Sequence, residues 1–144
     1  MSVATPPPEE LSALLRRSQR IAVVGASTSP AKPSHRIPAY LQRQGYDVLP
    51  VRPDGAEVLG RAAVATLADL SEPVDLVNVF RPADETPEIA RQAAAIGAPA
   101  LWLQQGIAHP EVARIGADAA MTVVMDACLG VVHARLLGDG SDGP

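Results

Sequence analysis

The sequence has few of the residues on which several classes of protein depend. Its single cysteine, Cys128, cannot form an internal disulfide, which favours a reducing compartment. Aromatic residues make up only 3% of the chain, too few for a nucleic-acid surface built on base stacking. The apolar runs are of strand length, far short of the roughly 20 residues that a membrane helix needs. We therefore expect a cytoplasmic protein with no nucleic-acid or membrane partner.

The two ends of the chain differ in composition from the middle. Residues 1–8 are rich in proline and contain neither the basic nor the apolar segment of a secretory signal, so we expect no such signal. Residues 138–144 have no apolar side chains to bury. We expect both ends to be flexible. Residues 9–137 are long enough for one domain with its own core.

Between these ends, short apolar segments alternate with segments of helical length. Strands are expected at residues 21–24, 46–51, 74–80, 100–103 and 121–125, with a shorter one near 61–64. Helices are expected at residues 9–18, 34–44, 84–96, 109–118 and 129–137. Strands that are apolar on both faces and separated by helices form parallel sheets. The pattern predicts an α/β fold, a single Rossmann-type, doubly wound and mostly parallel sheet with helices on both faces.

The segment VVGASTSPAKPSHR, residues 23–36, follows the first strand and contains a glycine and several hydroxyl side chains. Gly25 permits a tight turn where a side chain would collide with a ligand or the next helix. Ser34 is expected to cap that helix, whose amino end attracts anions. Lys32 and Arg36 would help to hold a multiply charged phosphate. Since doubly wound sheets bind ligands at the carboxyl ends of their strands, this segment predicts an anion-binding loop.

Positive charge is concentrated around this segment. Six basic and no acidic residues lie between Leu11 and Tyr46, although the net charge of the chain is −4. Two interpretations remain open: a basic face turned to solvent, or an anion-binding patch around the loop.

The loop departs from the dinucleotide-binding fingerprint. The second and third glycines of G-x-G-x-x-G are absent, and Arg52 follows the second strand where an acid would hold the ribose. Arg52 would suit a phosphate on the ribose, as in NADP or the 3′-phospho-ADP part of coenzyme A. An NAD(P)-binding oxidoreductase-like protein is an alternative, but the sequence shows no catalytic donor for it. A Walker loop is excluded, because no Gly-Lys-Ser/Thr sequence occurs.

Four segments carry a resemblance that covers residues 21 to 137. They read GASTSPAKPSHRI, YLQRQGYDVLPVRPDGAEVLG, VDLVNVFRPADETPEIARQAAAIGAPALWLQQGI and MTVVMDACLGVVHARLL. In content, order and spacing they resemble the small stand-alone CoA-binding proteins, which are similar to the CoA-binding domain of the succinyl-CoA synthetase alpha subunit. The resemblance implies a Rossmann-type domain that binds coenzyme A with its first loop around the phosphates.

The resemblance also implies which residues bind the ligand. Those at the phosphate end would be Gly25, Ala26, Ser27, Lys32, Ser34 and Arg36. Arg52 and Pro53 would lie near the adenosine moiety, and Phe80 and Arg81 would line the cleft. From their positions in the sequence, His35 and Gln104 are expected to reach the ligand as well. The chain departs from the family at Asp54, Pro82, Ala127 and Gly130, where the family often has basic residues.

No group of residues indicates catalysis or metal binding. Cys128 has no neighbouring base or cation in the sequence to form a thiolate, the three histidines are scattered, and no carboxylates are paired for acid–base work. We therefore predict a non-enzymatic protein that binds coenzyme A or acyl-CoA. A second alternative is a regulatory interaction module that has lost its nucleotide. A protein partner is unknown, and a homo-oligomer is compatible with the sequence.

Overall fold

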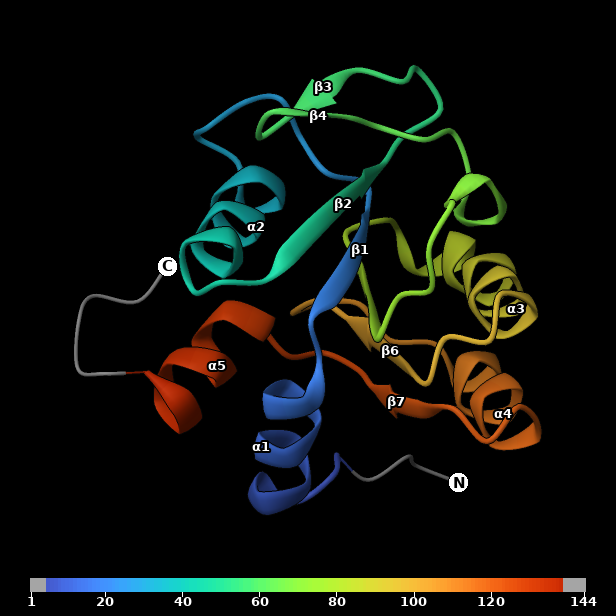
Figure 1. Cartoon of the computed structure of the whole chain (residues 1–144). Coiled ribbons are helices and arrows are strands. Elements are labelled where there is room, and N and C mark those ends of the chain that lie inside the picture. Colours follow the sequence, from blue (N-terminus) through green and yellow to red (C-terminus); the bar gives the residue numbers. More distant parts are fainter. Residues whose placement is uncertain (1–4, 139–144) are drawn as a thin grey trace.

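Five parallel strands form the central sheet of the computed structural model, which describes residues 5–138. The order across the sheet is β2-β1-β5-β6-β7. Figure 1 labels all of these strands except β5. The strands are β1 (Arg20–Val24), β2 (Asp47–Val51), β5 (Leu76–Val79), β6 (Ala100–Leu103) and β7 (Thr122–Val124). The predicted α/β Rossmann-like fold is confirmed, and this sheet is parallel throughout. Of the ends expected to be flexible, residues 1–4 and 139–144 lie outside the described residues, whereas Pro8 is the first residue of α1.

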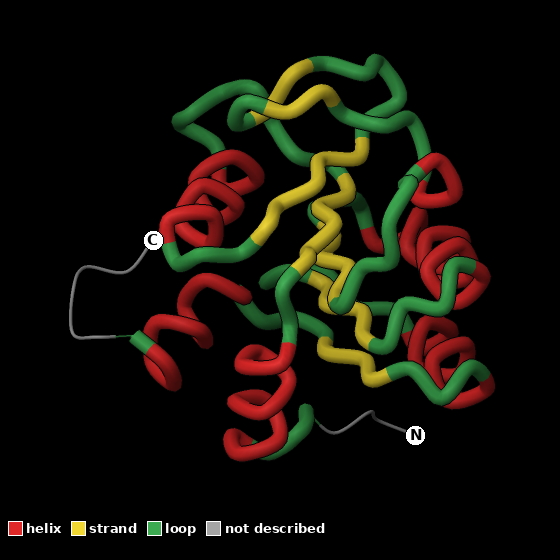
Figure 2. The backbone as a smooth tube through the Cα atoms, in the orientation of Figure 1, coloured by secondary structure: helices red, strands yellow, loops and turns green. Residues whose placement is uncertain are grey.

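Helices cover both faces of the sheet, as Figures 1 and 2 show. One face carries α1 (Pro8–Arg17), α2 (Pro33–Arg43) and α5 (Leu129–Leu137). The other carries α3 (Thr86–Ala95) and α4 (Pro110–Asp118). None of the helices among residues 5–138 has the length and apolar character that crossing a membrane requires.

Strand side chains alternate between two separate cores. In β1, Ile21 and Val23 pack with α1 and α2, whereas Ala22 faces the core under α3. In β6, Trp102 belongs to the same core as Ile21 and Val23, and Leu101 belongs to the same core as Ala22. All five side chains are fully buried. Because helices cover both faces, apolar residues are favoured at most strand positions, which explains the continuous apolar runs in the sequence.

Several elements differ from the sequence-based expectation for local reasons. The helix predicted at 84–96 begins with a separate 3-10 turn, η2 (Ala83–Glu85), before α3. The short strand near 61–64 is β4 (Arg61–Ala62), which pairs antiparallel with an unpredicted strand, β3 (Glu57–Val58). A second 3-10 turn, η1 (Leu67–Asp69), was not predicted either. Two-residue strands and single turns are too short for hydrophobic periodicity to reveal.

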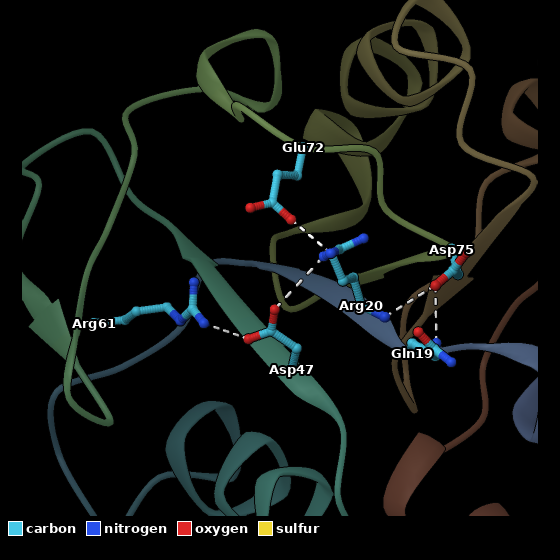
Figure 3. A network of polar contacts seen from close by, with 6 residues as sticks. All are labelled: Gln19, Arg20, Asp47, Arg61, Glu72 and Asp75. Carbon is cyan, nitrogen blue, oxygen red and sulfur yellow. Dashed lines mark hydrogen bonds and ion pairs between the residues drawn. The ribbon is translucent and has the colours of Figure 1, made fainter.

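Charged side chains join β1 and β2 at their amino ends (Figure 3). Arg20 lies 2.7 Å from Glu72 and 3.7 Å from Asp47, and Arg61 also pairs with Asp47. Asp75 accepts hydrogen bonds from the backbone N–H of Arg20 and of the preceding residue. The loop predicted to bind anions lies at the opposite end of β1. The basic run in the sequence is therefore divided between two ends of the sheet and does not form one patch.

A buried histidine joins α5 to the rest of its face of the sheet. His133 is 5% exposed, and its Nδ1 lies 2.9 Å from the hydroxyl oxygen of Tyr40. The rings of Tyr40 and Tyr46 meet the imidazole edge to face, each with its centroid 5.5 Å away. Burial lowers the pKa of His133 from its usual value of 6.5.

Acid should destabilise the fold through this histidine. Because the pKa of His133 is lower in the folded state, the unfolded chain binds more protons below about pH 6.5, and the free energy of unfolding falls there. We expect the urea concentration at the unfolding midpoint to decrease when the pH is lowered from about 7.5 to about 5.5. In His133→Gln this decrease should be smaller. His35→Gln is the control and should keep the wild-type pH dependence. The same pH dependence in His133→Gln and wild type would contradict this account.

Candidate functional site

A cleft of about 810 Å³ opens at the carboxyl ends of β1, β2 and β5. It lies where the strand order reverses between β1 and β5, the usual ligand position in a doubly wound sheet. The loop after β1 and the loop after β2 form one side, and η1 and the first turns of α3 form the other. Segments far apart in the sequence thus meet at one edge of the sheet.

Gly25 brings the first loop against the loop after β5. Its φ is +87°, and its backbone N–H donates to the Val51 carbonyl oxygen at 3.1 Å. A Cβ at this position would lie 2.7 Å from the Phe80 carbonyl oxygen and 2.9 Å from Cδ of Arg81. Both the backbone conformation and the close approach therefore require glycine. The collision that glycine avoids is with the neighbouring strand's loop, and not with the next helix.

Ser34 does not cap α2 as predicted. The helix begins at Pro33, and Lys32 is its N-cap residue without a side-chain hydrogen bond. The role of Ser34 comes from its backbone, because its carbonyl oxygen accepts the N–H of Ser27 at 3.0 Å. In a regular helix that carbonyl would accept from the residue four positions on, but Pro38 has no N–H. The proline thus releases an acceptor that fixes the loop.

Three basic side chains line the cleft, and two of them are already paired. Arg52 donates through Nε and Nη2 to Asp54 at 2.9 and 2.7 Å, and through Nη1 to the Ala26 carbonyl oxygen at 3.0 Å. Arg81 donates to the carboxylate of Glu85 at 3.1 and 2.8 Å. The third is Lys32. Within residues 5–138, no carboxylate pairs with its ammonium group.

The hydrogen bonds within these pairs shift the pKa of their members. Arg52 lowers the pKa of Asp54 to about 2, and Asp54 in turn raises the pKa of Arg52. The hydrogen bond to Glu85 raises the pKa of Arg81. Asp54 and both arginines are therefore charged at neutral pH.

Most of the residues predicted to bind a ligand meet in the cleft. They are Gly25, Ala26, Ser27, Lys32, Ser34, Arg52, Pro53, Phe80 and Arg81.

His35, Arg36 and Gln104 do not line the cleft. Arg36 donates to the carbonyl oxygen of Ala31, at 3.4 Å. Gln104 is only 6% exposed, and its side-chain oxygen accepts the N–H of Leu129 at 3.3 Å. Gln104 thus holds the start of α5 from inside the fold. Its predicted contact with a ligand is not supported by a position in the cleft lining.

Further residues of the cleft lining were not predicted from the sequence. Thr66 and Leu67 contribute from η1, and Ile89 and Gln92 contribute from α3. The one usable signal was the Thr-x-x-Asp spacing that ends at Asp69, whose carboxylate caps η1. That spacing is typical of a helix start. It would have predicted a turn here, but not which side chains face the cleft.

Cys128 lies away from the cleft, at the N-cap position of α5, and is partly exposed. Over residues 5–138, no three His, Cys, Asp or Glu side chains gather closely enough to hold a metal ion.

The sheet order and the cleft at its reversal point define a Rossmann-like α/β domain. The family model for the CoA binding domain matches residues 19–134, which is most of the chain. The chain therefore belongs to the CoA-binding domain family.

Several relatives match this chain over nearly their whole length. Uncharacterized protein YneT of Bacillus subtilis (strain 168) is 40% identical over 129 residues, covering 90% of this chain and 96% of that relative. The structure of cell-free ID.343 from Thermus thermophilus is 44% identical with a TM-score of 0.88, covering 92% of this chain and all of that one. A hypothetical protein from Pyrococcus horikoshii OT3 is 32% identical with a TM-score of 0.89, covering 96% and 100% of the two chains.

Proposed function

We propose that this protein binds coenzyme A or acyl-CoA without catalysis, with the phosphates against the loop after β1. One observation carries the proposal: the loop that lines the cleft contains hydrogen-bond donors without an acceptor within residues 5–138. Among the described residues, nothing accepts the backbone N–H groups of Ala26 and Thr28, and no carboxylate pairs with Lys32. Backbone N–H groups beside an ammonium group suit phosphate oxygens. The membership of the CoA-binding domain family supports the same ligand.

The rest of the lining supports a ligand with an apolar part. Val24, Leu67, Phe80 and Ile89 line the cleft together with the polar loop. An anionic group at the loop and a ring system or pantetheine chain against the apolar side chains would use both kinds of surface. The cleft volume of about 810 Å³ is in the range of sites for organic cofactors.

The lining supports binding without catalysis. A covalent or acid–base reaction needs a nucleophile beside a base, or an acid free to transfer a proton. The cleft walls, as far as residues 5–138 form them, contain no histidine and no cysteine. Their two carboxylates, Asp54 and Glu85, are both bound to arginines.

Replacing Lys32 by alanine should weaken CoA binding. Loss of one charge-assisted contact should cost roughly 1–2 kcal/mol, which is about a five- to thirtyfold rise in Kd. Isothermal titration calorimetry with coenzyme A measures this change. Arg43→Ala is the matched control, because it removes a positive charge from the opposite end of α2 and should leave the affinity unchanged. Equal affinities for Lys32→Ala and wild type would remove Lys32 from the site.

The same titration separates coenzyme A from other nucleotides. Tighter binding of NAD or NADP than of coenzyme A would overturn the proposal in favour of a dinucleotide-binding protein. A melting temperature that no nucleotide raises would favour an interaction module without a ligand, since a ligand stabilises the state that binds it.

A further inference from the structure

Two ion pairs reduce the positive charge that the cleft offers to a ligand. Its lining contains three basic side chains, Lys32, Arg52 and Arg81, and two acidic ones, Asp54 and Glu85. The formal charge of the lining is therefore +1. A single phosphomonoester already carries about −1.5 to −2 at neutral pH. Coenzyme A has such a group and a diphosphate in addition, so the charge of the cleft does not match that of its proposed ligand.

The arrangement of the two pairs places the carboxylates where phosphates would compete. Each carboxylate occupies the two-nitrogen side of its arginine, Nε with Nη2. The same fork-shaped side of arginine binds phosphate oxygens. Both pairs are partly exposed, with side-chain exposures of 24% and 57% for Arg52 and Asp54 and of 45% for both Arg81 and Glu85. Exposed pairs are weak and can exchange partners.

The arginines have anchors on the first loop that do not depend on these carboxylates. Arg52 donates to the Ala26 carbonyl oxygen at 3.0 Å. The stem of Arg81 packs against Gly25, so closely that a Cβ there would lie 2.9 Å from Cδ. Removing either carboxylate should therefore leave its arginine near the loop.

We propose that Asp54 and Glu85 are negative determinants of affinity, each withholding an arginine from the phosphates of the ligand. The inference rests on the proposed binding of coenzyme A. It adds that the two carboxylates oppose this binding, so that the ligand must exchange an arginine–carboxylate contact for an arginine–phosphate contact. Variants in which either carboxylate is replaced by the corresponding neutral amide should bind coenzyme A more tightly than wild type does.

Calorimetry with coenzyme A on Asp54→Asn, Glu85→Gln and wild type tests this inference. Asparagine keeps an oxygen to accept the Ala56 N–H, now bound by Asp54 at 3.1 Å, so the turn is retained. Each substitution should lower Kd roughly three- to tenfold, since it removes both a competing anion and a repulsive charge. Glu88→Gln is the matched control on α3. Glu88 pairs with Arg91 outside the cleft, so the Kd of Glu88→Gln for coenzyme A should equal that of wild type.

A second readout follows the arginines directly by NMR. The Nε–H resonances of Arg52 and Arg81 should move when coenzyme A is added to wild type, and that of Arg91 should not. Wild-type or weaker affinity in both Asp54→Asn and Glu85→Gln, or unmoved Arg52 and Arg81 resonances in a protein that binds coenzyme A, would overturn the inference alone. Absence of CoA binding in every protein, wild type included, would overturn the proposed function and this inference with it.

Discussion

Gly25→Ala should abolish measurable CoA binding and destabilise the fold. A side chain at a φ of +87° costs about 1–2 kcal/mol, because Cβ approaches the backbone. The added Cβ would also lie 2.7 Å from the Phe80 carbonyl oxygen, a backbone atom that cannot turn aside. Relief requires the first loop and the loop after β5 to separate, at about 1–3 kcal/mol more. Calorimetry with coenzyme A and urea unfolding measure the two effects.

Gly97→Ala separates the conformational cost from the collision. Gly97 follows α3 with a φ of +75°, and a Cβ there would meet nothing within 4 Å. In this control the free energy of unfolding should decrease by only about 1–2 kcal/mol, and coenzyme A should bind as it does to wild type. Wild-type CoA affinity in Gly25→Ala would show that the contact between the two loops does not shape the site.

Trp102→Ala should produce the largest loss of stability, roughly 3–5 kcal/mol. Trp102 is fully buried in the core under α1, α2 and α5. Its indole N–H also donates to the Ala127 carbonyl oxygen at 2.8 Å, tying β6 to the segment before α5. Alanine leaves a large cavity and an unpaired carbonyl group. Urea unfolding of Trp102→Ala against wild type measures the cost.

Trp102→Phe separates the two contributions of the indole. Phenylalanine keeps much of the apolar volume but cannot donate to Ala127, so it should cost less than alanine does. Since Trp102 does not line the cleft, Trp102→Phe should keep wild-type CoA affinity. A Trp102→Ala loss below about 1 kcal/mol would contradict the importance of this side chain to the core.

The fold was predictable because its determinants are local and repeated. A strand such as β1 is apolar from Ile21 to Val24, since both faces of the sheet are covered. The alternation of such strands with helices leaves few arrangements other than a parallel sheet. The position of the first loop at the carboxyl end of β1 follows directly. Gly25 and Lys32 could be placed at the cleft on this basis alone.

The direction of individual side chains could not be predicted in the same way. Gln104 follows β6 at the correct edge of the sheet, but its side chain turns inward to the N–H of Leu129. Arg36 lies one turn into α2 and faces back toward the loop carbonyl of Ala31. Such directions depend on which unpaired backbone groups lie nearby, and those groups come from distant parts of the sequence.

The net charge of the cleft lining could not be predicted from the sequence either. Arg52 was visible as a cation after the second strand, and Asp54 as an acid two residues on. Nothing in their spacing showed that the turn at Gly55 folds the carboxylate onto the guanidinium group. Counting basic residues therefore overestimated the positive charge available to a ligand.

The proline inside α2 has a consequence for the thermodynamics of association. Since Pro38 has no N–H to donate to Ser34, the Ser34 carbonyl oxygen accepts the N–H of Ser27, and this hydrogen bond restrains the turn. A restrained turn loses less conformational entropy when a ligand binds. Part of the affinity of a cofactor bound as proposed would thus originate at Pro38, which does not line the cleft.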